Sequence, residues 1–484
     1  MKERIKSFVL VLLILLSIGL TSITWIDERL WPDGYSLFVN VKEWPIIRNF
    51  FEKSYSMPME NLSKARKIVI ADGSGSSAVF YNGDRIYNDV YSDIESLITA
   101  FMNGEVEIKA TTLLTKENVR ELLNEQIMYT YVNYSVAMPG SFFGQLMGVA
   151  DSEAFSGLSL VRDFFILPTG DESLELLAID SETENVMRYE LNYEKTSGLI
   201  EKFIGYTEDV PPENYCVMAL QMNMDISSPS DAVKMKTLLD SFLVLDSAST
   251  ADSDKAEIKS INLLEEGVPA EVIKCFSYNP DSLYRYVDSE GTVVYLENDS
   301  SLKIHKNGLI EYEATSREHG ILLSGGTSLY ESLNSAIRFA GGVYFASSPD
   351  GEFPMNVSRD IRFETGGEME FLFDYYYDGT QVATIIKAGE EEMKHAVEMT
   401  VSGGYVTKFR MLLRSYSETG REREFINIYG AIDKIAANYE DAEEPVKVED
   451  LFPAYMEDGE SKALAPCWVG YVEGKQTVIY QWFL

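Results

Sequence analysis

An uncharged apolar run close to the N-terminus constrains this chain more than any other feature. Residues 8–26 (FVLVLLILLSIGLTSITWI) carry no charged side chain. As a helix, these 19 residues would be about 28 Å long at about 1.5 Å per residue. That length is close to the thickness of a bilayer hydrocarbon core, about 30 Å. The run therefore predicts a transmembrane anchor over residues 7–26.

The charges around this run predict its orientation. Residues 1–6 carry three basic side chains, whereas Asp27 and Glu28 follow the run. Because positively charged flanks stay in the cytoplasm, we expect a cytoplasmic tail over residues 1–6. The protein would then lie in the cell membrane, single-pass, with the bulk of the chain extracytoplasmic. A cleaved signal peptide is the alternative, but only Ser22 and Thr24 offer small residues near the spacing that cleavage needs.

One face of the anchor helix carries small and hydroxyl side chains. Positions three, four or seven residues apart share a helix face, and here they are Leu10, Leu13, Ser17, Leu20, Thr21 and Thr24. Such a face lets a second helix approach closely and exchange hydrogen bonds. We expect a partner helix to contact Leu13, Ser17, Leu20, Thr21 and Thr24. The alternative, in which the hydroxyls donate to carbonyls of a lone anchor, stays open.

Composition excludes some classes of function. The net charge of −36 and a sequence pI of about 4.4 would repel nucleic acid, so we expect no nucleic-acid partner. The lysines and arginines are scattered and form no basic stripe in the sequence. Three cysteines and three histidines lie far apart, which indicates neither a disulfide framework nor a zinc site. A single disulfide bond stays open.

The rest of the chain predicts an α+β fold class, in which the N-terminal single transmembrane helix precedes an extracytoplasmic multi-domain region of antiparallel sheets with packed helices. We expect an N-terminal α+β domain over residues 29–245 and a central β-meander domain over residues 256–325. A C-terminal α+β domain would follow over residues 326–484. The polar run Ser247–Asp254 suits a linker.

In the N-terminal domain, Lys67–Ile70 indicates a buried strand ending in a turn, and Asn103-Gly104 should stop a helix. That helix should bury Val90, Ile94, Leu97, Ile98 and Phe101. Thr115 and Ser141 are expected to be N-caps of two further helices.

The central strands are predicted from short apolar runs separated by turn residues. They cover Tyr284–Val287, Thr292–Glu297, Leu302–His305 and Leu309–Glu313. Between the last two, Asn307-Gly308 indicates a hairpin with a type I′ turn, which needs positive φ at both residues.

In the C-terminal domain, Ser328 and Glu331 predict a capping box, and Gly341-Gly342 should end the helix that it begins. Alternating strands follow around residues 369–377 and 405–413. A second helix near residues 428–436 and a closing hairpin at Glu473-Gly474 complete the domain.

The sequence contains no motif that convincingly indicates a catalytic site. Gly73–Ser77 lacks the lysine of a phosphate loop and suits a hairpin turn. Ser300–Lys303 matches an SxxK pattern but lies between predicted strands. Asp180–Glu184 lacks the glycine of a tight calcium loop, so a solvated turn is favoured. We therefore expect no enzyme activity, no cofactor and no metal.

The anchor and one central hairpin resemble a known family. Lys6–Thr21 followed by Trp25 looks like the anchor of the YycH proteins of Gram-positive bacteria. Tyr286–Gly291 with Leu309–Tyr312 is similar to that family's central pattern, in which a Tyr-x-Asp-Gly-type turn precedes a Leu-Glu-Tyr strand. In this chain the turn is extended by Ser289-Glu290.

The resemblance implies a role in signal transduction. YycH-like proteins, together with the related YycI, are membrane-anchored auxiliaries of the WalK sensor histidine kinase, in the two-component system with WalR that controls cell-wall homeostasis. The expected partners are accordingly a sensor histidine kinase and a YycI-like protein, contacted through the transmembrane helix and the outer domains. A homodimer is also compatible with a single anchor. The alternative is an anchored surface protein that binds or processes cell-wall material.

Overall fold

The computed structural model describes residues 64–480 with internal gaps. The gaps are residues 74–76, 83, 126–127, 150–153, 209, 212–213, 220–236, 241, 247–255, 266, 278–279, 298, 324–327, 349–352, 360, 362–367, 378–379, 389–390, 419–426, 440–445, 458–463 and 473–474. The predicted tail, the anchor with its helix face, and the linker at Ser247–Asp254 lie outside the described residues. Among the described helices, none has the length and apolar character needed to cross a bilayer.

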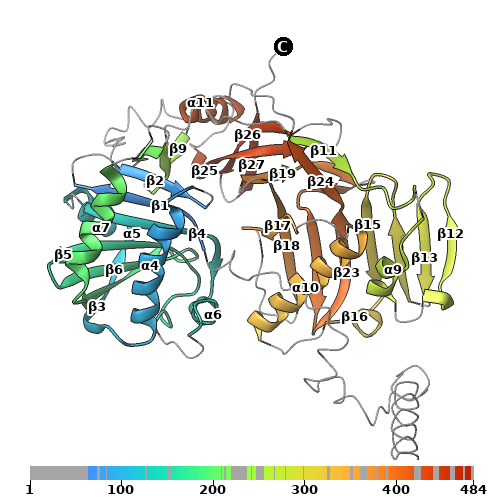
Figure 1. Cartoon of the computed structure of the whole chain (residues 1–484), viewed down its shortest axis with the longest axis horizontal. Helices are drawn as coiled ribbons and strands as arrows, with labels where there is room; N and C mark the ends of the chain where they lie inside the picture. The colour runs from blue at the N-terminus through green and yellow to red at the C-terminus, as the bar shows by residue number, and fades with distance from the viewer. Residues whose placement is uncertain are drawn as a thin grey trace, which may run out of the picture. The chain divides into compact units, whose positions relative to one another are not determined.

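The described residues, from 64 to 480, form one compact unit that contains two large sheets (Figure 1). The first sheet has nine antiparallel strands in the order β10-β8-β2-β1-β4-β5-β6-β7-β3. Its strands are β1 Ala65–Asp72, β2 Ser77–Tyr81, β3 Glu107–Thr115, β4 Met128–Met138, β5 Val161–Gly170, β6 Ser173–Asp180, β7 Asn185–Asn192, β8 Tyr215–Met218 and β10 Val244–Asp246.

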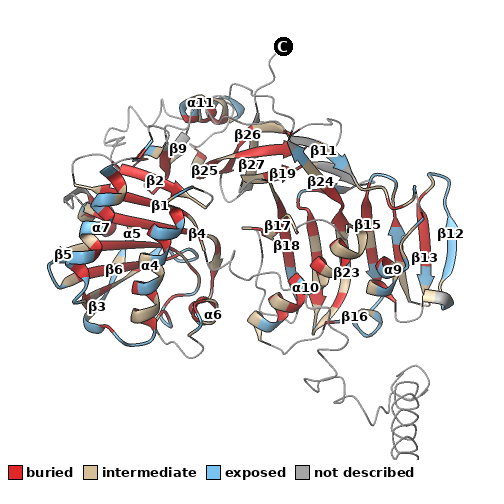
Figure 2. Cartoon of the chain, viewed as in Figure 1, coloured by how far each residue is buried: buried red, intermediate tan, exposed pale blue. Residues whose placement is uncertain are grey.

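Helices cover both faces of the first sheet. On one face lie α4 (Tyr87–Met102), α6 (Gly140–Leu146) and α7 (Thr196–Glu208), whose apolar side chains share a core with Ile68 and Ile70 of β1. On the other face lies α5 (Lys116–Glu125), which packs with the alternate residues of the same strands. Burial on both faces explains why the central strands are almost continuously apolar (Figure 2).

The second sheet follows the order β12-β13-β14-β15-β23-β22-β18-β19-β25-β26-β27, with β9, β16 and β17 paired beside this path. Its strands are β9 Thr237–Leu239, β12 Tyr284–Val287, β13 Val293–Glu297, β14 Ser300–Ile304, β15 Leu309–Ala314, β16 Ile321–Leu322, β17 Met355–Val357, β18 Glu368–Tyr377, β19 Thr380–Thr384, β22 Val397–Ser402, β23 Tyr405–Leu412, β25 Val446–Glu457, β26 Ala465–Val472 and β27 Lys475–Tyr480. Two small ribbons, β11 Ala256–Ser260 with β24 Arg414–Glu418 and β20 Ile386–Ala388 with β21 Glu391–Met393, complete the strands.

Helices also pack on the second sheet. On one face, α9 (Ala270–Phe276) and α10 (Leu329–Ser347) join a core that contains Phe409 of β23. Further along the chain, α11 (Ile428–Asn438) packs against buried Trp468 of β26. The predicted central meander is present as β12–β15, and β15 pairs with β23, so these strands continue directly into the C-terminal ones. The proposed domain boundaries stay a prediction.

The α+β class and most predicted elements are confirmed. The helix α4 buries all five predicted residues and ends at Asn103. The capping box of Ser328 and Glu331 is formed at the start of α10. Thr115 Oγ1 accepts a hydrogen bond from the Asn118 N–H at the start of α5.

Two helix predictions were wrong. The residue before α6 is Pro139, not Ser141, and no side chain caps this helix. Helix α10 does not end at Gly341-Gly342 but continues to Ser347. Val343 and Tyr344 extend its buried face, and this burial outweighs the cost of about 1 kcal/mol for a glycine inside a helix.

The hairpin at Asn307-Gly308 exists, but its predicted turn type was wrong. Gly308 has a φ of 86°, whereas Asn307 is not among the described non-glycine residues with positive φ. The Gly308 N–H donates to His305 O at 3.2 Å, and the His305 N–H donates to Leu309 O at 2.9 Å. The connection is thus a three-residue loop that needs one left-handed residue and not two.

Candidate functional site

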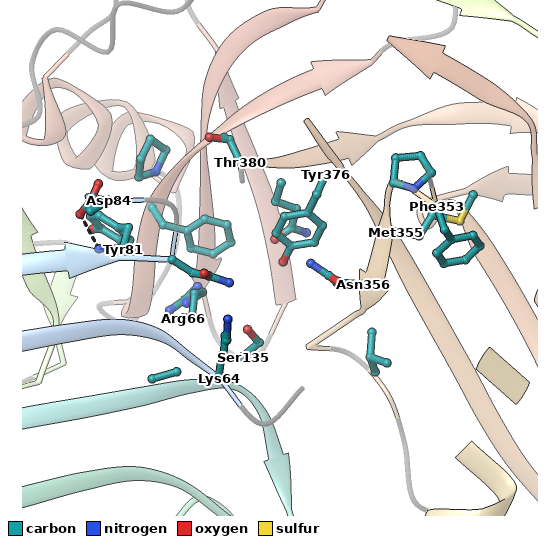
Figure 3. Close-up of a pocket in the computed structure, with 17 residues that line it drawn as sticks. Lys64, Arg66, Tyr81, Asp84, Ser135, Phe353, Met355, Asn356, Tyr376 and Thr380 are labelled. Carbon is teal, nitrogen blue, oxygen red and sulfur yellow. Dashed lines mark hydrogen bonds between the residues drawn. The ribbon is translucent and has the colours of Figure 1, made fainter. Parts of the chain in front are cut away.

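A cavity of about 610 Å³ opens where the start of β1 and the end of β2 face β17, β18, β19 and β25 of the second sheet (Figure 3). Its wall includes four aromatic rings: Tyr81, Phe353, Tyr376 and Phe452. Between them lie hydrogen-bonding and charged side chains: Lys64, Arg66, Asn82, Asp84, Ser135, Asn356, Thr380 and Gln381. A concave surface with this mixture of rings and polar groups is typical of a ligand site.

Because β1 pairs irregularly with β4, the side chains of the consecutive residues Arg66 and Lys67 reach the same carboxylate. Neighbouring residues of a regular strand point to opposite faces, but the register of β1 against β4 shifts between Ala65 and Lys67. As a result, Arg66 Nη2 and Lys67 Nζ both contact the carboxylate of Asp450, with 3.0 Å from Lys67 Nζ to Oδ1. A second register shift, between Val448 and Asp450, occurs where β25 pairs with β26.

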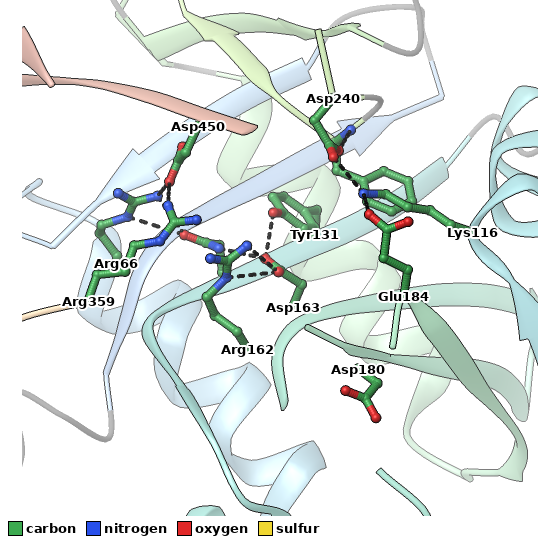
Figure 4. A network of polar contacts seen from close by, with 12 residues as sticks. Arg66, Lys116, Tyr131, Arg162, Asp163, Asp180, Glu184, Asp240, Arg359 and Asp450 are labelled. Carbon is green, nitrogen blue, oxygen red and sulfur yellow. Dashed lines mark hydrogen bonds and ion pairs between the residues drawn. The ribbon is translucent and has the colours of Figure 1, made fainter. Parts of the chain in front are cut away.

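Asp450 is the centre of an inter-sheet cluster, which we define as Arg66, Lys67, Arg162, Asp163, Arg359 and Asp450. Figure 4 shows all of these side chains except Lys67 with labels. Its carboxylate is 5% exposed and also accepts from Arg359 Nη1 at 2.6 Å. One side chain of the second sheet thus binds two cations of the first sheet and one that follows β17.

Asp163 forms the other half of the cluster. It accepts hydrogen bonds from Tyr131 Oη at 2.7 Å and from Asn133 Nδ2 at 2.6 Å, and Arg162 Nε donates to it at 3.0 Å. Asn133 connects the two halves, because its Oδ1 also accepts from Arg66 Nη2 at 2.9 Å. The hydrogen-bond network therefore runs from β5 through β4 and β1 to β25.

The inter-sheet cluster carries surplus positive charge. Its four cations face two carboxylates, which gives a net charge of +2 in a chain whose net charge is −36. A neighbouring group is balanced by comparison: Lys116 and Lys447 contact Asp240 and Glu184.

Burial and the neighbouring charges together shift the pKa values of the cluster. Burial alone would raise the pKa of Asp450, but the charges of Arg66, Lys67 and Arg359 outweigh it and hold the pKa well below its usual range. Burial lowers the pKa of Lys67, and Asp450 only partly opposes that shift. Burial and the nearby guanidinium of Arg162 also lower the pKa of Arg359. The pKa values of Arg66 and Arg162, by contrast, are raised, because the charges of Asp450 and Asp163 outweigh the effect of burial.

Two rings reduce the cost of burying these cations. The Arg66 guanidinium carbon lies 4.4 Å from the ring centroid of Phe452, and that of Arg359 lies 3.8 Å from the ring centroid of Tyr471. Such cation–π contacts partly replace the lost hydration. Arg66 is shared by the cluster and the cavity wall, so the two form one continuous region.

The other candidates from the sequence lie elsewhere. The β1–β2 connection near Gly73–Ser77 joins antiparallel strands, and Ser300–Lys303 lies in β14, as expected. The Asp180 carboxylate accepts a hydrogen bond from the backbone N–H of Glu182 in the turn after β6, and another from the N–H of Ser159, which precedes β5. Cys275 and Cys467 carry free thiols. Within the described part of the chain, no group of three or more His, Cys, Asp or Glu could hold a metal ion.

Sequence reasoning missed the inter-sheet cluster, since it treated the basic residues as scattered. A usable signal was present in two strands. Arg66-Lys67 stands directly before the apolar Ile68–Ile70, and Arg162-Asp163 stands directly before Phe164. Consecutive charges at the start of a strand buried on both faces require partners, because an isolated buried charge is strongly unfavourable.

No protein-family model matches the chain, and no curated protein matches it in sequence. In structure, the chain is similar to YycH from Bacillus subtilis, with a TM-score of 0.54, 11% sequence identity, and coverage of 88% of this chain and 97% of that chain. A protein described as uncharacterized, from Eubacterium rectale, aligns with 49% of this chain and 86% of that chain at 13% identity, but its TM-score of 0.29 carries no argument. The chain therefore has a YycH-like fold.

Proposed function

We propose that this chain is a YycH-like regulator: a membrane-anchored, extracytoplasmic auxiliary of a WalK-like sensor histidine kinase that takes part in cell-wall homeostasis. The observation that supports this proposal is the fold similarity to Bacillus subtilis YycH, which extends over 97% of that chain. The resemblance of the N-terminal run and the central hairpin to the same family supports it independently.

In this proposal the chain acts through protein contacts and not through catalysis. The predicted helix of residues 7–26 packs against a helix of the kinase or of a YycI-like partner. Ser17, Thr21 and Thr24 allow the close approach, since small and hydroxyl side chains favour contact between helices in lipid. The outer region, whose two sheets are joined by the inter-sheet cluster, contacts the extracytoplasmic parts of the partners.

The helix contact is tested by paired substitutions in the full chain, expressed in its native membrane. Replacement of Ser17 and Thr24 by leucine should abolish regulation, measured with a reporter of the two-component system, because bulky side chains hold the partner helix away. Ser22→Leu is the matched control: it also exchanges a hydroxyl for leucine, but on the opposite side of the helix. We expect it to preserve regulation.

Crosslinking in the membrane, followed by identification of the captured protein, tests the partner itself. Capture of a sensor histidine kinase would support the proposal. If an unrelated transmembrane helix in place of residues 7–26 restored full regulation, the helix-contact mechanism would be wrong. If crosslinking of a functional chain captured no kinase, the proposed function as a whole would be wrong.

A further inference from the structure

We propose that the cavity between the two sheets is a binding site for a small anionic saccharide. Figure 3 shows the residues that line it. Its size, its rings, its hydrogen-bonding groups and its charge support this proposal.

Size and shape admit a ligand of one to a few sugar rings. A volume of about 610 Å³ lies inside the range of about 300–1,000 Å³ that is usual for small-molecule sites. The rings of Tyr81 and Tyr376 stand on different strands, β2 and β18, around the opening. Flat aromatic faces of this kind pack against the C–H faces of a sugar ring, whose other side remains free for hydrogen bonds.

The polar half of the wall suits a polyhydroxyl ligand better than an acyl chain. Asn82, Asn356 and Gln381 carry amide groups, which both donate and accept hydrogen bonds. Hydroxyl groups of a sugar do the same, so amides can satisfy them without added charge. A hydrogen bond fixes the orientation of the Gln381 side chain, because its Nε2 donates to Asp374 Oδ2 at 3.0 Å.

Charge selects an anion. Lys64 and Arg66 line the cavity, and Arg66 belongs to the inter-sheet cluster with its net charge of +2. The opposing carboxylate on the wall, Asp84, accepts hydrogen bonds from the Tyr81 N–H at 2.7 Å and from Asn214 Nδ2 at 3.2 Å. A local excess of cations on a strongly acidic protein gives an anion a specific place to bind. Carboxylate or phosphate groups pair best with such side chains.

The test compares sugars that differ in one charged group. Glucuronic acid and glucose share a pyranose ring, and acetate carries the carboxylate alone. Binding to the full chain in lipid nanodiscs is measured by titration calorimetry at low salt. We expect glucuronate to bind about tenfold or more tightly than glucose, with acetate weaker than both, because the charge-assisted contact adds to the ring contacts.

Variants assign the effect to the cavity. Lys64→Gln should reduce the preference for glucuronate over glucose by about tenfold while leaving glucose binding in place, because one of the two cations on the wall is lost. Lys109→Gln, which removes an exposed lysine from β3, is the matched control and should keep the preference. Tyr376→Leu should weaken both sugars, since it removes a ring from the wall.

Three results would overturn the proposal. If glucuronate and glucose bound with equal affinity, the cavity would not select an anion. If acetate bound as tightly as glucuronate, the cavity would not recognise a saccharide. If neither sugar bound, the cavity would not be a saccharide site. No kinase is present in these measurements, so their failure and the failure of the proposed regulatory function are distinguishable.

Discussion

Asp450 shows how much of this molecule depends on one side chain. Its carboxylate contacts Arg66, Lys67 and Arg359, and it lies on the opposite sheet from the first two. Removing one partner of a buried ionic group leaves the other charges without compensation, which costs more than the intact pair contributes. The inter-sheet cluster already carries surplus positive charge. Loss of this carboxylate should therefore destabilise the buried charges of all three cations.

We therefore expect Asp450→Asn to lower the free energy of unfolding by about 3–5 kcal/mol. Asparagine keeps the shape and one hydrogen-bond acceptor but removes the negative charge. Urea denaturation of the full chain in detergent, followed by tryptophan fluorescence, to which buried Trp468 contributes, measures the change. Asp433→Asn, on the exposed side of α11, is the control and should change stability by no more than about 0.5 kcal/mol. Equal effects of the two variants would contradict the assigned role of Asp450.

At the scale of single elements, local sequence patterns correctly predicted helices whose formation depends on nearby residues. Helical spacing identified α4, and an adjacent serine and glutamate identified the start of α10. The errors arose where tertiary packing competes with local preference. Helix α10 continues through Gly341-Gly342 because the residues beyond them are buried, and the sequence does not state what they are buried against.

The loop at Gly308 offers a test of such packing. Gly308 has a φ of +86°, and a Cβ atom built on it would lie 2.9 Å from each of two carbonyl oxygens, those of Ile261 and Leu413. Gly308→Ala should therefore cost about 2–4 kcal/mol, of which about 1–2 kcal/mol is the left-handed backbone and the rest is the close contact. The measurement is again the midpoint of urea unfolding.

Gly104→Ala separates the two contributions. Gly104 has a φ of +69°, but an added Cβ would meet no atom within 4 Å. Its substitution should cost only the backbone share, about 1–2 kcal/mol. If alanine were tolerated equally at both positions, the close approach of the Ile261 and Leu413 carbonyls to Gly308 would not exist in solution.

At the scale of the whole molecule, the association of the two sheets could not be predicted. Lys67 and Asp450 are 383 positions apart, and their contact depends on two register shifts in different strands. Periodicity indicates which face of a strand is buried, but it does not say which distant strand supplies the partner. The α+β class could be predicted because it depends on local sequence patterns. The inter-sheet cluster and the cavity could not be predicted, because they depend on the pairing register of strands that are far apart in the sequence.

The acid stability of the whole chain follows from the charges of the cluster. The pKa values of Asp450 and Asp163 are lowered by the fold, so their contribution to stability is complete above the unfolded value of about 3.9. It is lost as the pH falls below that value toward their folded pKa values. Protonation of the many surface carboxylates acts in the opposite direction, since it relieves repulsion in a chain with a net charge of −36.

The two effects separate when the wild-type chain is compared with Asp450→Asn across the same pH range. Surface carboxylates are common to both proteins and cancel in the difference, which then reports on Asp450. We expect the difference in unfolding free energy to be large and constant from pH 7 to about pH 5, and to shrink below about pH 4 as Asp450 takes up a proton in the unfolded state of the wild type. Thermal unfolding at intervals of half a pH unit measures it. A difference that stays constant down to pH 2, or that grows on acidification, would mean that the fold does not lower the pKa of Asp450 and that its carboxylate does not join the two sheets as an ion.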